Sequence, residues 1–480
     1  MTDGADPNPG DLVLAIDQGG HASRAMLFDG RGDLCAEAFA PLETRRPREG
    51  WVEHDAESLL ASVRAAVAQA LSARVDRSRV RAAGLATQRS SIVCWNRRTG
   101  EALSPVISWQ DRRNAGWLER LGLDTAAVRQ ATGLVISPHY GASKLRWCLE
   151  HLPPVRAARA AGTIAAGPVA SFLLHRLLEE RPLLVDPANA SRTLLWDYRR
   201  RDWSQPLLDA FEIPRAVLPQ CAGSRHPFGT LDISAAGIPL EVCTGDQSAV
   251  PFAFGEPRSE TVYVNIGTGA FIQRLIERPP DAPRGLLVSV AWQHAAEAIY
   301  ALEGTVNGAG SALEIFAPEP GLDPADAFAS GGAEPPLFLN GVSGLGSPYW
   351  LPHFESRFIG AGNAGARQRA VLESIAFLIV ENLELMRAQG GPLAVAVVTG
   401  GLACRDVLCR LLADLGGLDV LRPGVREASA RGVAWLTAGR PAGWQGAARR
   451  FEPAPAPALF ARFAGWRAAM QAAGAVANRG

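Results

Sequence analysis

Residues 12–29 read LVLAIDQGGHASRAMLFD, and residues 261–272 read TVYVNIGTGAFI. Each stretch is an apolar strand, a glycine-containing tight turn and a second apolar strand, the pattern of a β-hairpin whose turn can approach a ligand closely. One such hairpin carries little information, because hairpins are common and most glycine turns only satisfy backbone geometry. Two of them, each opening one half of a long chain, predict a duplicated domain that holds one phosphate-bearing ligand from both sides.

The composition of the chain bounds what it can be. At 480 residues it is long enough for two domains with separate cores, and its 48% hydrophobic and 20% charged content is ordinary for a globular protein. The formal net charge is zero, so nothing indicates binding to nucleic acid or to an anionic membrane. Seven scattered cysteines without a CxxC pair argue against a disulfide framework or a zinc site. Without an apolar span or a signal peptide, we expect a cytoplasmic protein.

Apolar periodicity around the hairpins predicts α/β domains with mixed sheets. Asp55 can cap a helix whose apolar residues recur at helical spacing between 59 and 71. Strands are expected at 82–87 and 240–243, and a turn followed by a helix is expected at 303–316.

These elements suggest a division of the chain into segments. We expect a flexible leader at 1–10, an N-terminal domain at 11–250 on the acceptor side, and a C-terminal domain at 251–445 on the nucleotide side. A helical tail at 446–480 is expected to pack on the second domain. The hinge between the domains is placed near 246–258.

Read in chain order, a series of short motifs resembles the FGGY carbohydrate kinases, and among them most of all the glycerol kinases. No single motif is diagnostic, but their order and their spread over residues 11–445 make the resemblance strong. The motifs are residues 14–29, GWVEHD at 50–55, TQR at 87–89, WQDRR at 109–113, residues 137–147, NASRT at 189–193, GDQ at 245–247, GTG at 267–269, LEG at 302–304, residues 343–350, residues 372–376 and GG at 400–401.

The resemblance implies two actin-like (ribonuclease H-like) ATPase domains, an interdomain cleft, and ATP and Mg²⁺ as cofactors. By resemblance, Asp17 serves the metal, Asp246 is the general base, and Arg24 faces the γ-phosphate. These roles suit the chemistry, because phosphoryl transfer needs a held metal, an aligned hydroxyl and a cation near the developing charge. A turn aspartate bonded to its own backbone, a helix-capping aspartate and an exposed strand arginine are the structural alternatives.

Two groups of ligand contacts also follow from the resemblance. Backbone amides of glycine turns can bind phosphate oxygens, and a residue without a side chain lets a flat base approach. Aromatic rings can cover the C–H faces of an acceptor while polar groups bind its hydroxyls. The expected ATP-binding residues are Gly19, Gly20, His21, Gly267, Thr268, Gly269, Gly310, Gly400 and Gly401, and the expected acceptor-binding residues are Arg89, Ser90, Trp109, His139, Asp246, Gln247 and Phe271.

The chain departs from the family mainly at these ligand sites. Gly20, His21 and Ala22 replace two threonines and a serine of the first phosphate loop, and an imidazole N–H of His21 could substitute as a donor. Ser90 replaces a glutamate, a loss of hydrogen bonding worth about 1.5–3 kcal/mol for a charged group. His139 stands where the family has a tyrosine. These changes suggest a different acceptor or weakened use of ATP.

Our leading hypothesis is an enzyme, an ATP-dependent kinase that phosphorylates a hydroxyl of a small polyol or sugar: glycerol, a ketose or a longer polyol. The alternative is a non-catalytic or regulatory protein that binds a nucleotide or sugar on the same scaffold. An ATPase acting on protein partners is disfavoured, because nothing resembles a peptide-binding domain. A homo-oligomer is left open, since family members often form dimers or tetramers.

Overall fold

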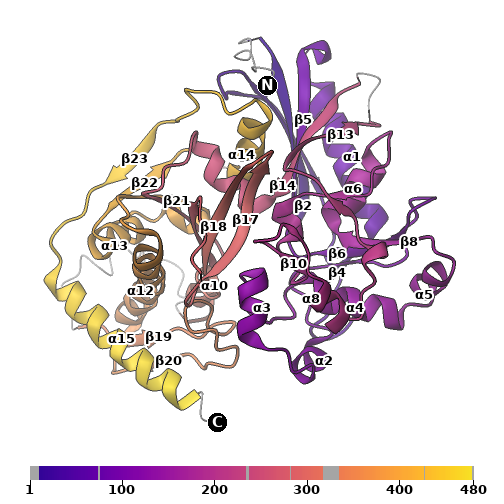
Figure 1. Cartoon of the computed structure of the whole chain (residues 1–480). Coiled ribbons are helices and arrows are strands. Elements are labelled where there is room, and N and C mark those ends of the chain that lie inside the picture. The colour runs from indigo at the N-terminus through magenta and orange to yellow at the C-terminus, as the bar shows by residue number, and fades with distance from the viewer. Residues whose placement is uncertain are drawn as a thin grey trace. The chain divides into compact units, whose positions relative to one another are not determined.

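The computed structural model describes residues 10–73, 76–233, 237–281, 283–316, 334–425 and 427–477. The chain divides into two compact units, each built from non-contiguous segments (Figure 1). Unit 1 comprises Met1–Pro257, Val288–Tyr300 and Glu427–Gln445, and unit 2 comprises Arg258–Leu287, Ala301–Arg426 and Gly446–Gly480. Most of the leader expected at 1–10 lies outside the described residues.

Unit 1 is centred on a six-stranded mixed sheet in the order β13-β14-β5-β1-β2-β3. The first hairpin is confirmed, because β1 runs antiparallel to β2, while β1 and β14 both run parallel to β5. Helices α1 and α14 lie on opposite sides of this sheet (Figure 1). The elements are β1 (Leu12–Gln18), β2 (Ala22–Asp29), β3 (Leu34–Pro41), β5 (Val80–Thr87), β13 (Arg225–Thr230), β14 (Pro239–Gly245), α1 (Ala56–Ser72), α6 (Val169–Leu177) and α14 (Ala428–Thr437).

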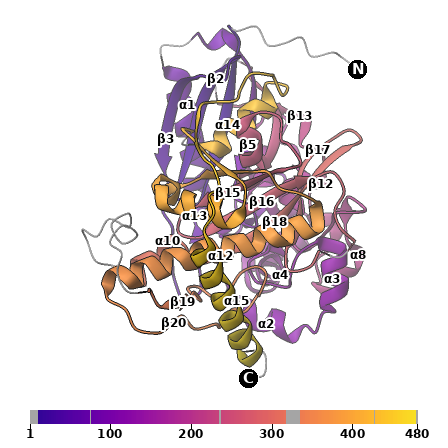
Figure 2. The same ribbon diagram turned by 90° about the vertical axis from the view of Figure 1, so that its left-hand side faces the viewer.

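Unit 2 holds the second hairpin in a sheet whose full order is β17-β18-β16-β15-β21-β22-β23. Residues 288–300 of the β17–β18 hairpin belong to unit 1. Helix α12 crosses α15 (Figure 2), where the ring of Phe377 contacts the rings of Phe463 and Trp466. The elements are β15 (Thr261–Ile266), β16 (Ala270–Ile276), β17 (Leu287–His294), β18 (Glu297–Val306), β21 (Val395–Thr399), β22 (Asp419–Pro423), β23 (Ala448–Phe451), α10 (Gly310–Phe316), α12 (Ala364–Gly390), α13 (Asp406–Gly416) and α15 (Pro457–Ala477).

The two large sheets share one plan. In unit 1 the order β3-β2-β1-β5-β14-β13 corresponds strand by strand to β18-β16-β15-β21-β22-β23. In both, the hairpin is antiparallel, the next two strands follow in parallel, and the last strand is antiparallel again. The duplication predicted from the two hairpins is therefore confirmed.

The smaller elements surround these sheets. Strands β4, β7, β6 and β8 form a four-stranded sheet, which carries the loops of the candidate acceptor site. These elements are β4 (Glu53–His54), β6 (Ile92–Asn96), β7 (Val106–Ile107), β8 (Ile164–Pro168), β9 (Leu184–Val185), β10 (Trp196–Asp197), β11 (Asp202–Trp203), β12 (Gln220–Cys221), β19 (Leu337–Leu339), β20 (Arg357–Ile359), α2 (Ala115–Arg120), α3 (Thr125–Thr132), α4 (Gly141–His151), α5 (Pro153–Ala160), α7 (Pro187–Ala190), α8 (Gln205–Ala210), α9 (Asp246–Ala249) and the 3₁₀ turns η1 (Arg77–Arg79), η2 (Arg215–Val217), η3 (Val250–Phe254) and η4 (Gly401–Cys404).

Several local predictions can be compared with these elements. The cap of α1 is confirmed, since Asp55 accepts a hydrogen bond from the amide of Ser58. The turn and helix expected at 303–316 are present, since α10 runs from Gly310 to Phe316, but the turn begins later than expected because β18 extends to Val306. Pairing with a neighbouring strand keeps Glu303 in extended conformation.

The compact units also differ from linear domain boundaries, because α14 packs into the first sheet although it lies late in the chain. Two glycines allow the close approach. A Cβ on Gly84 would lie 2.2 Å from Thr437 Oγ1, and one on Gly432 would lie 1.9 Å from the carbonyl oxygen of Ala249. Among the described residues, no helix is both long and apolar enough to cross a bilayer.

Candidate active site

The carboxyl ends of three parallel strands meet at one edge of the unit 1 sheet. Gln18 of β1 and Gly245 of β14 both pair in register with Thr87 of β5. The residues next to these positions, Asp17 and Asp246, are therefore brought to the same edge from distant parts of the chain. Ligands of open α/β sheets bind at this end of the strands.

Asp17 is a buried carboxylate with 6% of its surface exposed. Burial raises its pKa to about 7, the charge of Asp246 contributes to the rise, and Arg24 opposes it. Its Oδ1 atom is buried without a hydrogen-bond partner. An unsatisfied carboxylate oxygen of this kind fits a hard cation such as Mg²⁺, which is commonly held by one or two carboxylates together with water and substrate phosphates. Among the described residues no group of three metal-ligating side chains occurs.

Asp246 begins the short helix α9 directly after β14. Its Oδ1 accepts a 2.6 Å hydrogen bond from the amide of Gln247 and lies 4.0 Å from Nε of Arg89. The side chain of Asp246 is 23% exposed, whereas that of Arg89 is 5% exposed. Glycine at 245 makes this arrangement possible, because a Cβ there would lie 2.5 Å from the side chain of Arg89. Asp246 thus does not cap α9, whose N-cap is Gly245; its carboxylate bonds the neighbouring backbone amide and stays partly open.

Arg24 directly opposes Asp17 in the β1–β2 ladder, so the two side chains share one face. Its Nε lies 3.3 Å from a carboxylate oxygen of Glu427, and its guanidinium covers the ring of Phe39 at 5.4 Å. Arg24, Phe39 and Glu427 line a surface hollow of about 360 Å³, together with Gln69. Glu427 was not singled out from the sequence; no motif connected it with a strand so early in the chain.

The first phosphate turn is closed by its own backbone. The amide of Gly19 donates to the carbonyl of Ala22 at 2.9 Å, and the carbonyl of His21 accepts from the amide of Leu42 at 2.8 Å. The side chain of His21 is exposed, and a Cβ on Gly20 would meet nothing within 4 Å. The turn therefore has room beside it, and the phosphate-binding role of His21 stays a prediction.

The predicted acceptor residues of unit 1 gather around one hydrogen-bonded loop. Ser91 Oγ donates to Gln88 Oε1 at 2.8 Å and accepts from the amide of Trp109 at 3.0 Å. The centroid of the Trp109 ring lies 5.4 Å from the centroid of the His139 ring. Gln247, from the start of α9, has a buried Oε1 without a hydrogen-bond partner. These contacts place two rings and an unsatisfied acceptor in the same unit as Asp246.

Ser90 is a buried residue in the left-handed region, with φ of 65°. Its hydroxyl donates to the carbonyl of Arg192 at 3.1 Å. The hydroxyl proton of Ser90 is thus already used on the backbone and cannot be donated to a bound phosphoryl acceptor.

Part of the WQDRR motif is structural. Asp111 accepts from the amide of Val52 at 2.6 Å and from Arg113, whose guanidinium also bonds Glu53 and covers the ring of Trp51. This cluster ties the GWVE segment to the acceptor loop. These buried charged side chains thus join the two motifs in one hydrogen-bonded cluster.

Unit 2 brings its predicted nucleotide residues together in the same manner. The amide of Gly267 donates to the carbonyl of Gly269 at 2.8 Å. The amide of Gly310 donates to the carbonyl of Gly267 at 2.9 Å. A Cβ on Gly400 would lie 2.5 Å from the carbonyl oxygen of Ile266, so β21 ends against the same turn. Thr268 joins this cluster through its carbonyl, which accepts from the amides of Ala309 and Ser311. Gly401 follows at the start of η4, whereas Phe271 lies one residue into β16 and is half-buried.

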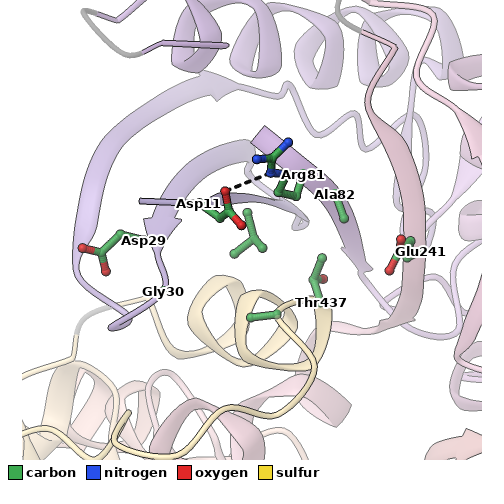
Figure 3. Close-up of a pocket in the computed structure, with 9 residues that line it drawn as sticks. Asp11, Asp29, Gly30, Arg81, Ala82, Glu241 and Thr437 are labelled. Carbon is green, nitrogen blue, oxygen red and sulfur yellow. Dashed lines mark hydrogen bonds and ion pairs between the residues drawn. The ribbon is translucent and has the colours of Figure 1, made fainter. Parts of the chain in front are cut away.

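A separate cavity of about 210 Å³ lies at the opposite end of the unit 1 strands (Figure 3). It is lined by residues at the starts of β1 and β5, by residues of β14, and by the end of α14. Asp11 and Arg81 already pair there at 2.9 Å. The amino ends of the strands carry none of the predicted site residues, so this cavity is not a candidate for the chemistry.

Two family models cover most of the chain: the N-terminal domain of the FGGY family of carbohydrate kinases matches residues 12–253, and its C-terminal domain matches residues 262–439. The chain is 36% identical to a glycerol kinase of Geobacter sp. (strain M21), with 89% of each chain covered. It is 37% identical to a glycerol kinase of Methylobacterium nodulans, covering 96% of this chain and 97% of the relative.

Solved structures agree on the fold. Plasmodium falciparum glycerol kinase with ADP superposes with a TM-score of 0.87 at 21% identity, covering 96% of this chain and 98% of that one. A xylulose kinase from Rhodospirillum rubrum gives 0.85 at 23% identity, covering 97% and 100%. At such identities the likeness shows the fold alone.

Together, the duplicated sheets and these matches define a phosphoryl-transferring enzyme of the two-domain, actin-like ATPase class. The chain belongs to the FGGY family of carbohydrate kinases and is an ATP-dependent carbohydrate kinase. The kinase hypothesis is thereby favoured over the non-catalytic binding protein that the sequence left open.

Proposed function

We propose that this enzyme transfers the γ-phosphoryl group of ATP to a hydroxyl of a small polyol or sugar, and that Asp246 is the general base. The observation that carries the proposal is the partly exposed Asp246 carboxylate at the same sheet edge as the buried Asp17. A carboxylate there can accept the proton of the attacking hydroxyl as the phosphoryl group arrives. Nε of Arg89 lies 4.0 Å from that carboxylate, so a cation stands beside the proposed base.

The acceptor would be bound by unit 1. The rings of Trp109 and His139, whose centroids lie 5.4 Å apart with planes tilted by 59°, would offer one joined aromatic surface to the C–H groups of a polyol or sugar, and Gln247 would offer its buried, unpaired Oε1 to a hydroxyl. Because Ser90 donates its hydroxyl proton to the carbonyl of Arg192, it would offer a bound hydroxyl only one short oxygen where the family has a carboxylate. Glycerol and a longer polyol or ketose are both consistent with this arrangement.

The nucleotide would be bound by unit 2. There Thr268, Gly400 and Gly401 are exposed and Gly267, Gly269 and Gly310 are half-buried around one turn, where residues without side chains would let a flat base and phosphates approach the backbone. When bound, Mg²⁺ neutralises charge on the transferring phosphates, and Asp17 is the residue that would hold it, directly or through water. Arg24, on the same face as Asp17, would stabilise the charge that develops on the γ-phosphate once it exchanges Glu427 for the substrate.

Substitution of Asp246 by Asn tests the proposal. We expect kcat to fall by about 10²–10⁴-fold, the typical contribution of a general base, with little change in the KM for ATP. The measurement is coupled ADP release over a panel of glycerol, xylulose and longer polyols. Asp202→Asn is the matched control, since Asp202 also pairs with an arginine but on an exposed surface. Wild-type-like turnover by Asp246→Asn would refute the assignment of the base.

A further inference from the structure

Lys144, on α4, is the single lysine of the chain. It is 1% exposed, and its Nζ atom donates to the carbonyl oxygens of His139 at 2.7 Å, Ser108 at 2.9 Å and Ser90 at 3.1 Å. An ammonium group has three N–H donors, so every one of its hydrogen bonds is used on a backbone carbonyl. A neutral amine has only two donors and would leave one of these carbonyls without that hydrogen bond.

The three carbonyls belong to three separate segments that carry predicted acceptor residues. Ser90 follows Arg89, Ser108 precedes Trp109, and His139 itself carries the ring that contacts the ring of Trp109. None of these segments is a regular helix or strand at the bonded residue. Their mutual placement therefore depends on contacts such as these rather than on a ladder of backbone hydrogen bonds.

The charged groups that act on Lys144 are Asp111 and Arg113. Asp111 is already bonded to the amide of Val52 and to Arg113. Burial lowers the pKa of Lys144 to about 7, although Asp111 acts to raise it, and Arg113 lowers it further. The ammonium form that joins three segments is thus in balance with the neutral form near physiological pH.

We propose that Lys144 is a positioning residue for the phosphoryl acceptor: its ammonium group holds the segments of Arg89, Trp109 and His139 in binding geometry without touching the acceptor. This inference rests on the proposed function, since it assumes that these side chains bind the acceptor. It also predicts that acceptor binding weakens when Lys144 loses its proton, while nucleotide binding does not.

Steady-state kinetics on the full-length enzyme test the role. In Lys144→Met we expect the KM for glycerol, or for whichever panel acceptor the wild type uses best, to rise by about tenfold or more, because small displacements of binding groups are costly. The KM for ATP should stay within about twofold of the wild-type value, because unit 2 is unchanged. Arg274→Met is the matched control, because Arg274 is equally buried and also donates to backbone carbonyls, but in unit 2. A similar rise in acceptor KM in both variants would overturn the proposal.

A spectroscopic measurement on the wild type avoids any dependence on the folding of a variant. Lysine labelled with carbon-13 at Cε gives one resonance, which needs no assignment because Lys144 is the single lysine. Its pH titration should report a pKa far below that of ordinary lysine. Saturation with the acceptor should raise that pKa, by about one unit if protonation favours binding tenfold, since the coupling is reciprocal.

The outcomes separate the two proposals. Failure of the wild type to phosphorylate any acceptor would contradict the proposed function. Turnover with an unchanged acceptor KM in Lys144→Met, or a Lys144 pKa that saturating acceptor does not move, would contradict the positioning role. A pKa near that of exposed lysine would contradict the predicted weakening of acceptor binding when Lys144 loses its proton near neutral pH.

Discussion

At the scale of single residues, Asp17 shows how a binding site costs stability. Its carboxylate is buried, its Oδ1 has no hydrogen-bond partner, and its pKa is raised to about 7 by burial and by Asp246. Below about pH 4, the pKa of Asp17 in the unfolded chain, the carboxyl is protonated in both the folded and the unfolded state. Its burial then costs no free energy of unfolding through ionisation. Between about pH 4 and 7 the unfolded state ionises first and the penalty grows, and above about pH 7 the full penalty applies.

Replacement of Asp17 by Asn should therefore stabilise the ligand-free enzyme while abolishing efficient phosphoryl transfer. A shift of about three pH units corresponds to roughly 4 kcal/mol, from which an unsatisfied amide takes back about 1–3 kcal/mol. The gain in the free energy of unfolding should grow from about pH 5 to 7 and then level off. Denaturant unfolding of the wild type and of Asp17→Asn across that pH range measures this gain. A gain in the free energy of unfolding that does not change with pH would rule out ionisation of Asp17 as its cause.

At the scale of elements, α14 and α9 are coupled through a glycine. Gly432 of α14 faces the carbonyl of Ala249, the last residue of the helix that Asp246 begins. A Cβ there would lie 1.9 Å from that oxygen, so backbone must move to accommodate it. Rigid packing of this kind transmits a small change in one helix to the side chain at the start of the other.

Substitution of Gly432 by Ala should lower both stability and catalysis. Overpacking of a core typically costs about 1–3 kcal/mol, and displacement of α9 should reduce kcat by about tenfold or more through Asp246. Thermal unfolding and ADP-release kinetics measure the two effects. Gly424→Ala is the control, because a Cβ at Gly424 would meet nothing within 4 Å. Equal behaviour of the two variants would refute the coupling.

At the scale of the molecule, unit 1 is assembled from three separate pieces of chain. Its last piece includes α14, whose side chains Val433, Trp435 and Leu436 are almost fully buried, and Trp435 stacks on Phe252. Burial of three large apolar side chains is worth about 5–9 kcal/mol, which is comparable with the whole stability of a domain. A cut in the linear sequence therefore cannot separate the two units cleanly.

A fragment consisting of residues 1–257 should fail to form a cooperative, tightly packed structure, although it contains every strand of the first sheet. We expect loss of the near-ultraviolet circular dichroism and of a sharp thermal transition, both of which the full chain should show. Restoring residues 427–445 through a linker should recover part of both signals. A cooperatively unfolding 1–257 fragment would show that α14 is dispensable to this unit.

Much of this enzyme follows from local signals. The strand–turn–strand patterns around Gly19 and Thr268 are short-range, so the sequence predicted both hairpins and, through their repetition, the duplicated fold. The helix cap at Asp55 follows from the same kind of local signal. The motifs that carry the family resemblance are also contiguous, which is why candidate site residues could be named in advance.

Other features could not be read from the sequence, because they join residues that are distant along the chain. Glu427 pairs with Arg24 only because the fold brings them together. Lys144 likewise bonds the carbonyls of Ser90 and Ser108 only because the loops of the smaller sheet converge on it. For the same reason the sequence placed the start of the turn before α10 too early, at Glu303, although β18 continues to Val306.

Patterns along the chain were therefore enough to predict the repeated α/β plan, the family and the chemical types present at the candidate site. Which carboxylate is buried, which arginine has an acidic partner and which hydroxyl is already bonded to backbone became known from the folded arrangement. The physical reason is that burial and hydrogen bonding depend on what lies nearby in space, and a one-dimensional pattern specifies only what lies nearby in the chain.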